Sequence, residues 1–112
     1  MKLSRFEYDV IFTILSNELP KLVGLIQKVN VVSREYTGVG MFINLSTESD
    51  SVSGYSKTLG TSFYANIEGI EHGIGAILYI DDGLLTMLEL FCHGPEVFPK
   101  IIQTYSIEDL DA

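Results

Sequence analysis

The sequence has only one cysteine, Cys92, among its 112 residues. A lone cysteine cannot form a disulfide within the chain, and chains without disulfides are typical of reducing compartments. The opening MKLSRFEYDV has no unbroken apolar segment before its charges, so it does not resemble a secretory signal. No stretch approaches the ~18 apolar residues that a membrane-spanning helix needs. We therefore expect a cytoplasmic protein with no membrane partner.

Basic residues are scarce in the second half of the sequence. Residues 1–58 carry six acids and six bases, whereas residues 59–112 carry nine acids and a single base, Lys100, so the net charge of −8 belongs to the second half. Phosphate binding needs a cationic footprint, and we therefore expect no nucleic-acid partner. An acidic surface can instead attract a basic protein partner, or it can simply keep the protein soluble.

The sequence also lacks the motifs that identify common catalytic and cofactor sites. GIGAIL has neither the third glycine nor the following helix of a dinucleotide fingerprint, and no Walker loop, G-x-S-x-G or H-E-x-x-H occurs. One cysteine and two isolated histidines are too few for a zinc site, which needs three or four ligands at recognisable spacing. We expect no metal ion and no cofactor, and a role other than catalysis is favoured.

Two helices are predicted near the start of a single domain that spans residues 1–112. Ser4 and Glu7 form the S-x-x-E pattern of a capping box, in which each side chain binds a free backbone N–H. Apolar residues then recur at helical spacing through residues 8–15. The same spacing returns in residues 22–29 after Pro20, which suits a first helical position.

From Val29 onward the apolar period changes from that of a helix to that of strands. We expect strands in residues 29–37, 39–46, 61–69, 73–80, 84–92 and 101–110, a turn in residues 69–75, and a serine-rich loop over residues 46–60. Helices followed by strands predict an α+β fold with two N-terminal helices packed on one face of a mainly antiparallel five- or six-stranded sheet. The expected core is Phe12, Leu15, Leu22, Ile26, Phe42, Leu78, Ile80, Met87 and Phe91.

Asp82-Gly83 lies between two apolar, β-rich runs and predicts a type I′ hairpin turn. Counting outward from this turn places Ile80 opposite Leu85 and Ala76 opposite Glu89. Neighbouring strand residues point to opposite faces, so Asp81 and Asp82 should not converge on one substrate. The same argument separates Cys92 from His93.

Glu89 is a carboxylate in the middle of a strand, where burial without a partner would be costly. Three explanations are open from the sequence. Glu89 lies on the solvent face, or it pairs with Arg34 or Lys28, or it binds a ligand in a groove between helices and sheet with Tyr36 or Tyr79 beside it.

The stretches REYTGVGMFINL and GIGAILYIDDGLLTMLELFCHG resemble a group of small bacterial proteins. That group carries a Glu-aromatic-Thr-Gly-x-Gly-aromatic strand pair, an apolar hairpin that ends in Leu-Glu, and a proline-containing link. The resemblance covers about half of the chain, and FCHG stands where the group has an aromatic-rich segment. An immunity-type role, in which a small protein inhibits a toxin, is the function class that the resemblance implies, and it assigns no catalytic residue.

Three functions follow from these observations. The first is a non-enzymatic interaction module, such as an acidic immunity-type inhibitor of a basic protein, because acids and exposed tyrosines form workable interfaces. The second is a small-ligand or enzymatic site around Glu89. The third is a homodimer that uses the two-sided apolar hairpin. The candidate interaction residues are Tyr64, Glu68, Glu71, Tyr79, Glu89 and Tyr105.

Overall fold

The first helix begins where the sequence predicts it. In the computed structural model, which describes residues 1–49 and 54–108, α1 spans Arg5–Glu18. The Glu7 N–H donates to Ser4 Oγ at 3.1 Å and the Ser4 N–H donates to Glu7 Oε1 at 2.7 Å, which confirms the capping box. The expectation that Phe12 is buried is wrong. Phe12 points away from the buried face of α1 and stacks on Tyr8, with ring centroids 6.3 Å apart.

The second helix is a 3₁₀-helix, η1 (Pro20–Lys28). Gly24 lies in its middle, and a glycine there weakens an α-helix by about 1 kcal/mol relative to alanine. Ile26 is buried as expected, whereas Leu22 is only partly buried. In the described part of the chain, no helix is long and apolar enough to cross a membrane.

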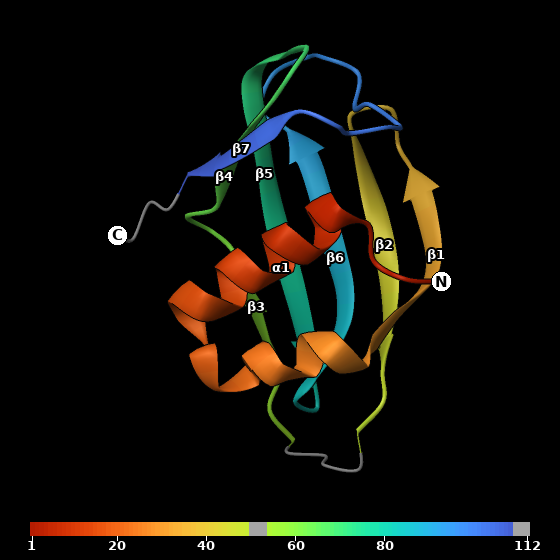
Figure 1. Ribbon diagram of the computed structural model, residues 1–112, viewed down its shortest axis with the longest axis vertical. Helices are drawn as coiled ribbons and strands as arrows, with labels where there is room; N and C mark the ends of the chain where they lie inside the picture. Colours follow the sequence, from red (N-terminus) through yellow and green to blue (C-terminus); the bar gives the residue numbers. More distant parts are fainter. Residues whose placement is uncertain (50–53, 109–112) are drawn as a thin grey trace.

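The sheet has seven strands, and every pairing between them is antiparallel. Their order is β1-β2-β6-β5-β4-β7 (Figure 1). β3 pairs with the same edge of β5 as β4 does, farther along β5. The strands are β1 (Val29–Tyr36), β2 (Gly40–Thr47), β3 (Lys57–Leu59), β4 (Tyr64–Ile67), β5 (Ile70–Asp81), β6 (Leu84–Cys92) and β7 (Tyr105–Glu108). The α+β class and the antiparallel sheet are therefore confirmed.

The predicted strand count of five or six is too low. β3 forms within the segment that the sequence predicts to be a loop, and residues 50–53 of that segment lie outside the described residues. The turn expected in residues 69–75 is also wrong, because β5 already begins at Ile70. Three glycines interrupt the apolar pattern in that stretch and hide the strand from a sequence-based prediction.

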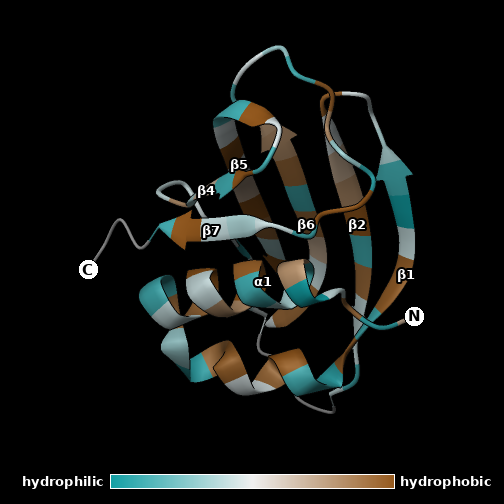
Figure 2. Ribbon diagram, turned by 45° about the horizontal axis from the view of Figure 1, so that its top comes forward, coloured by the Kyte–Doolittle hydropathy of each residue, from teal (hydrophilic) through white to brown (hydrophobic). Residues whose placement is uncertain are grey.

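One face of the sheet packs against α1 and η1 (Figure 1), and we call this the helix side. Figure 2 shows hydrophobic stretches of β5 and β6 behind α1 and of β2 beside them. In β2 the alternation expected from the sequence is confirmed, since the buried side chains of Met41, Ile43 and Leu45 lie on one face, toward the helices. The buried strand residues on this side include Met41, Ile43, Leu45, Ala76, Leu78, Ile80, Leu85, Leu88 and Leu90.

The Asp82-Gly83 turn has the predicted geometry, with φ of 53° at Asp82 and 78° at Gly83. Ile80 lies opposite Leu85 as expected, but a bulge then shifts the register, and Glu89 lies opposite Ile77 instead of Ala76. A shift of one residue moves every later side chain to the other face.

The bulge explains the errors at Met87 and Phe91 in the predicted core, because both residues follow it in β6. Leu15, Ile26, Leu78 and Ile80 are buried as expected. Phe42, Met87 and Phe91 are instead partly buried on the side of the sheet that faces away from the helices.

Candidate functional site

The side of the sheet away from the helices carries large side chains that no described helix covers (Figure 1). Phe42, Glu89 and Ile77 lie opposite one another across β2, β6 and β5, and therefore form one row. Met87 and Tyr79 form the row on one side of it, and Phe91 lies in the row on the other side. We call this surface the open face and define it as Phe42, Ile77, Tyr79, Met87, Glu89 and Phe91, all partly buried.

Glu89 lies near the centre of the open face and has a tyrosine as its partner. The Tyr79 hydroxyl donates to Glu89 Oε1 at 3.0 Å. Burial, this hydrogen bond and the nearby negative charge raise the pKa of the Tyr79 phenol. The bond orients the carboxylate but leaves acceptor capacity on both oxygens for donors from a partner molecule.

These contacts decide between two of the explanations open for Glu89. The solvent-face explanation agrees with its position on the open face. The pairing with Arg34 is wrong, because Arg34 binds Glu7 of α1 on the helix side.

An aromatic stack extends the open face toward β4. The Tyr64 ring stacks on His93 with centroids 5.7 Å apart, and His93 meets the Phe91 ring edge-on at 5.5 Å. The rings can lie this close to the sheet because Gly73 and Gly75 have no side chains. A methyl group on Gly75 would approach Phe91 Cζ to 2.6 Å, and one on Gly73 would overlap the Tyr64 ring.

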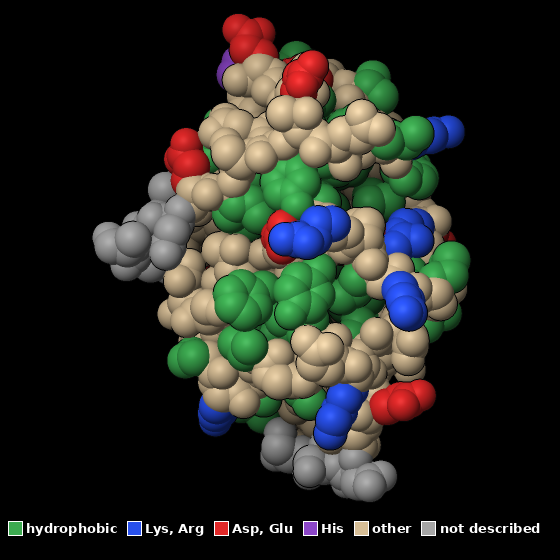
Figure 3. Space-filling view, viewed as in Figure 1, with side chains coloured by type: hydrophobic (Ala, Val, Ile, Leu, Met, Phe, Trp, Pro, Cys, Tyr) green, Lys and Arg blue, Asp and Glu red, His purple; other side chains and the backbone are tan. Residues whose placement is uncertain are grey.

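All seven Lys and Arg residues lie on the helix side or on the elements that cover it. Arg34 is bonded to α1, and Lys57 lies opposite Ile80, whose side chain is buried against the helices. Lys100 lies over the Tyr36 ring at 5.8 Å. Figure 3 views this side and shows Lys and Arg side chains spread across it. The seven residues are Lys2, Arg5, Lys21, Lys28, Arg34, Lys57 and Lys100.

The side with the open face carries acids without bases. Glu35 shares its face with Phe42, which lies opposite it on β2. Asp81 follows the inward-pointing Ile80 and accepts a hydrogen bond from Thr86 at 2.6 Å on the outer side. With Glu89, these residues make the side away from the helices uniformly negative, so a cationic partner would find no like charge on it.

The six residues proposed from the sequence lie in three places. Tyr64, Tyr79 and Glu89 are brought together on or beside the open face. Glu68 and Glu71 are exposed around the turn between β4 and β5 and take no part in this surface.

Tyr105 lies on the helix side and contacts α1. Its hydroxyl donates to Asp9 Oδ2 at 2.6 Å, and its ring meets Phe6 edge-on at 4.8 Å. The hydrogen bond to Asp9 and burial raise the pKa of the Tyr105 phenol. These contacts fix β7 to α1 and give Tyr105 a structural role, and the interaction role expected for it stays a prediction.

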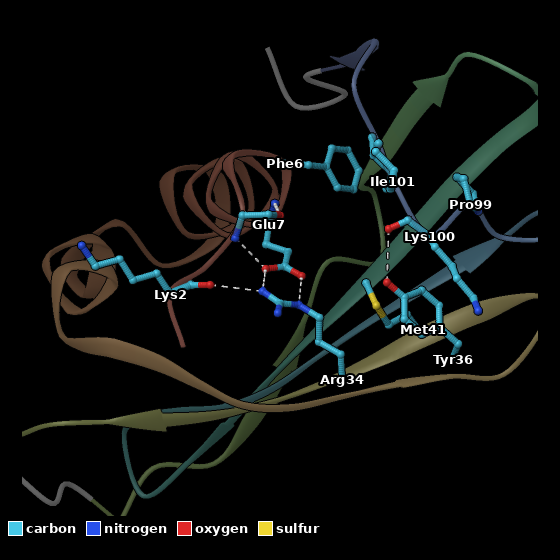
Figure 4. Close-up of a pocket in the computed structure, with 11 residues that line it drawn as sticks. Lys2, Phe6, Glu7, Arg34, Tyr36, Met41, Pro99, Lys100 and Ile101 are labelled. Carbon is cyan, nitrogen blue, oxygen red and sulfur yellow. Dashed lines mark hydrogen bonds and ion pairs between the residues drawn. The ribbon is translucent and has the colours of Figure 1, made fainter.

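The sequence did not reveal the ion pair between Glu7 and Arg34, which joins α1 to β1 (Figure 4). Arg34 Nε donates to Glu7 Oε2 and its Nη2 donates to Glu7 Oε1, both at 2.7 Å, and Nη2 also donates to the Lys2 carbonyl. Burial alone would raise the pKa of Glu7. The hydrogen bonds and charge of Arg34, with the Ser4 bonds, outweigh burial and hold that pKa below its ordinary value.

His72 and Glu96 form a second ionisable pair at the start of β5, with His72 Nδ1 3.0 Å from Glu96 Oε1. The hydrogen bond with Glu96 and its charge raise the pKa of His72, and the same bond lowers that of Glu96. Burial and the charge of Glu96 raise the pKa of the Cys92 thiol, which makes it a poor nucleophile at neutral pH. Among residues 1–49 and 54–108, no group of three His, Cys, Asp or Glu residues is placed to hold a metal ion.

Comparisons of the chain with protein-family models, curated proteins and solved structures found no match.

Proposed function

We propose that this protein is a non-enzymatic interaction module whose open face binds a basic protein. The observation that carries the proposal is the charge separation across the sheet, with acids and no bases on the side of the open face. Complementary charge speeds association and excludes wrong partners, while partly buried aromatic and aliphatic groups supply contact area. An immunity-type inhibitor that covers a basic toxin is the specific form suggested by the REYTGVGMFINL resemblance.

The same charges argue against a homodimer built on the open face. A second copy placed there would bring its own Glu35, Asp81 and Glu89 against the first set, and opposed like charges disfavour association. A basic partner avoids that repulsion.

The proposal is tested by capturing partners from the native lysate with immobilised protein at low and high salt. Ile77→Arg places a positive charge in the centre of the open face. Phe12→Arg makes the matched change at an exposed position on α1. We expect one basic protein to bind the wild type and Phe12→Arg at low salt, and to be lost from Ile77→Arg and at high salt.

Two results would overturn the proposal. One is a partner that binds Ile77→Arg as well as the wild type. The other is light scattering that shows a wild-type dimer which Ile77→Arg dissociates, because the open face would then bind a second copy. Circular dichroism of both variants confirms that neither is unfolded.

A further inference from the structure

β1 is an edge strand whose outer side is only partly covered. It stands at the end of the strand order, and among the described residues no other strand pairs with that side. The first residue covers one point of the edge. The Val31 N–H donates to the Met1 carbonyl at 2.7 Å, and the Met1 amino group donates to the Val31 carbonyl at 3.1 Å. Edge strands with free N–H and C=O groups are templates for pairing with another chain.

In the second half of β1, the backbone N–H and C=O groups of Arg34 and Tyr36 point outward, away from β2. The Thr37 N–H donates to the Gly40 carbonyl at 3.0 Å, so Thr37 points toward β2. Inward and outward backbone groups alternate along an antiparallel strand, which makes Tyr36 outward, Glu35 inward and Arg34 outward. An extended segment beside β1 could therefore form hydrogen bonds with the N–H and C=O groups of every second residue, Arg34 and Tyr36.

Exposed apolar side chains gather along the same edge. Eight large hydrophobic residues are exposed in the described chain. Six of them lie in β1, in the turn after β1, at residue 1 beside its edge, or in the link that follows β6. The link is tied to this turn, since the Phe98 N–H donates to the Gly38 carbonyl at 2.8 Å. The six are Met1, Val32, Tyr36, Val39, Val97 and Ile101.

A groove of about 390 Å³ runs beside this edge on the helix side, between the amino-terminal segment, β1 and residues 99–102. Figure 4 shows Lys2 and Lys100 at opposite ends of it, with the Glu7–Arg34 pair and Tyr36 between them. Glu7 is neutralised by Arg34, so the two lysines leave the groove positively charged. Lys100, the single base in residues 59–112, thus lies at one end of this groove and Lys2 lies at the other.

We propose that the outer edge of β1 at Arg34–Tyr36 accepts an extended acidic segment of a partner protein as an additional strand. Main-chain hydrogen bonds would supply affinity, apolar residues of the segment would contact Tyr36 and Ile101, and acids at its ends would meet Lys2 and Lys100. A second copy of this chain fits less well, because it would bring two sets of these lysines together. This site is separate from the open face and attracts a partner of the opposite charge.

The test is an NMR titration with a short blocked peptide that has two acidic residues at each end and Val-Thr-Val between them. We expect shifts of the Arg34 and Tyr36 amides and slower hydrogen exchange at both when the peptide is bound. A peptide with lysines in place of the acids, and one N-methylated on alternate amides, test the charge and the ladder separately. Neither should bind.

Two double variants carry the same change in charge. Lys2→Glu with Lys100→Glu should raise the peptide Kd about fivefold, since each exposed ion pair contributes about 0.5 kcal/mol. Lys21→Glu with Lys57→Glu, away from the groove, should leave the Kd within about twofold.

Each of three outcomes would overturn the proposal. The first is the absence of any shift at millimolar acidic peptide. The second is equal binding of the lysine or N-methylated peptide. The third is protection of the Arg34 and Tyr36 amides without peptide in a protein that light scattering shows to be a dimer, since a second copy would then occupy the edge.

Discussion

Glu7 and Glu89 are both carboxylates in regular structure, but their surroundings differ. Glu7 is 2% exposed and is held by two hydrogen bonds from Arg34 together with the bond from the Ser4 N–H. Glu89 is partly buried and accepts one hydrogen bond from Tyr79. A compensated charge is used to join elements of the fold, whereas an uncompensated one keeps its charge available to a partner.

The same contrast separates the two surfaces to which these residues belong. The groove beside β1 has its acid neutralised and keeps the charges of Lys2 and Lys100. The open face has no base to neutralise Glu89. A chain with a net charge of −8 therefore carries two surfaces of opposite charge, and net charge alone describes only one of them.

The largest expected effect comes from removing the charge of Glu7. Glu7→Gln leaves Arg34 without its countercharge, and we expect the free energy of unfolding to fall by about 2–3 kcal/mol, somewhat less than for a wholly buried pair. The effect is smaller than for a wholly buried pair because the Arg34 side chain is 24% exposed. Urea unfolding measures it. The same substitution at Glu89 is the control and should change stability by no more than about 0.5 kcal/mol.

The pH dependence of this effect has a definite sign. The folded state lowers the pKa of Glu7, so the stabilisation is complete above the unfolded carboxyl pKa of about 4.3 and is lost as the pH falls through the lowered value. The difference between wild type and Glu7→Gln should therefore shrink in acid. A difference that stays constant down to acid unfolding would mean that Glu7 acts through packing and not through its charge.

A smaller effect on stability is expected from a substitution in the turn between β5 and β6. Gly83 has a φ of 78°, which alanine adopts only with strain, so Gly83→Ala should cost about 1 kcal/mol and lower the melting temperature by about 4 °C. Gly24→Ala is the control, since a methyl group there meets no atom within 4 Å and Gly24 has no positive φ. Equal melting temperatures for the two variants would contradict the turn geometry on which the register of β5 and β6 depends.

The smallest expected effect is on the titration of Tyr79. Its phenol pKa is raised by burial and by Glu89, so Glu89→Gln should move that pKa back toward the ordinary value of about 10. NMR of the Tyr79 ring through alkaline pH measures the shift. Because the folded state raises the pKa, the associated stability is present below pH ~10 and is lost as the pH rises through the folded value. An unchanged titration would show that Glu89 does not hold the Tyr79 proton.

Local signals in the sequence predicted local structure well. Ser4 with Glu7, Asp82 with Gly83, and the alternation in β2 each depend on neighbouring residues, and the structure confirms all three. Contacts between distant residues left no such signal. Glu7 and Arg34 are 27 positions apart, and nothing in the sequence pairs them.

The open face was predicted in part. Tyr64 and Tyr79 were identified as aromatic surface candidates, and Glu89 was identified because a carboxylate in the middle of a strand is costly to bury without a partner. Phe91 was assigned to the core instead, because a bulge adds one residue without changing composition and so cannot be recognised from the apolar pattern. Phe42 lies in β2, which that bulge does not shift, and it was assigned to the core because large apolar side chains are usually buried.

The bulge makes the open face independent of one residue in the sequence. In β6, Thr86 is the extra residue between Leu85, opposite Ile80, and Met87, opposite Tyr79. A deletion of one codon there would leave Met87 opposite Tyr79 and Glu89 opposite Ile77, so the carboxylate would stay on the outer side of the sheet. Descendants of this gene can therefore lose Thr86 without moving the acidic surface, whereas a one-codon deletion between Met87 and Glu89 would turn Glu89 toward the helices.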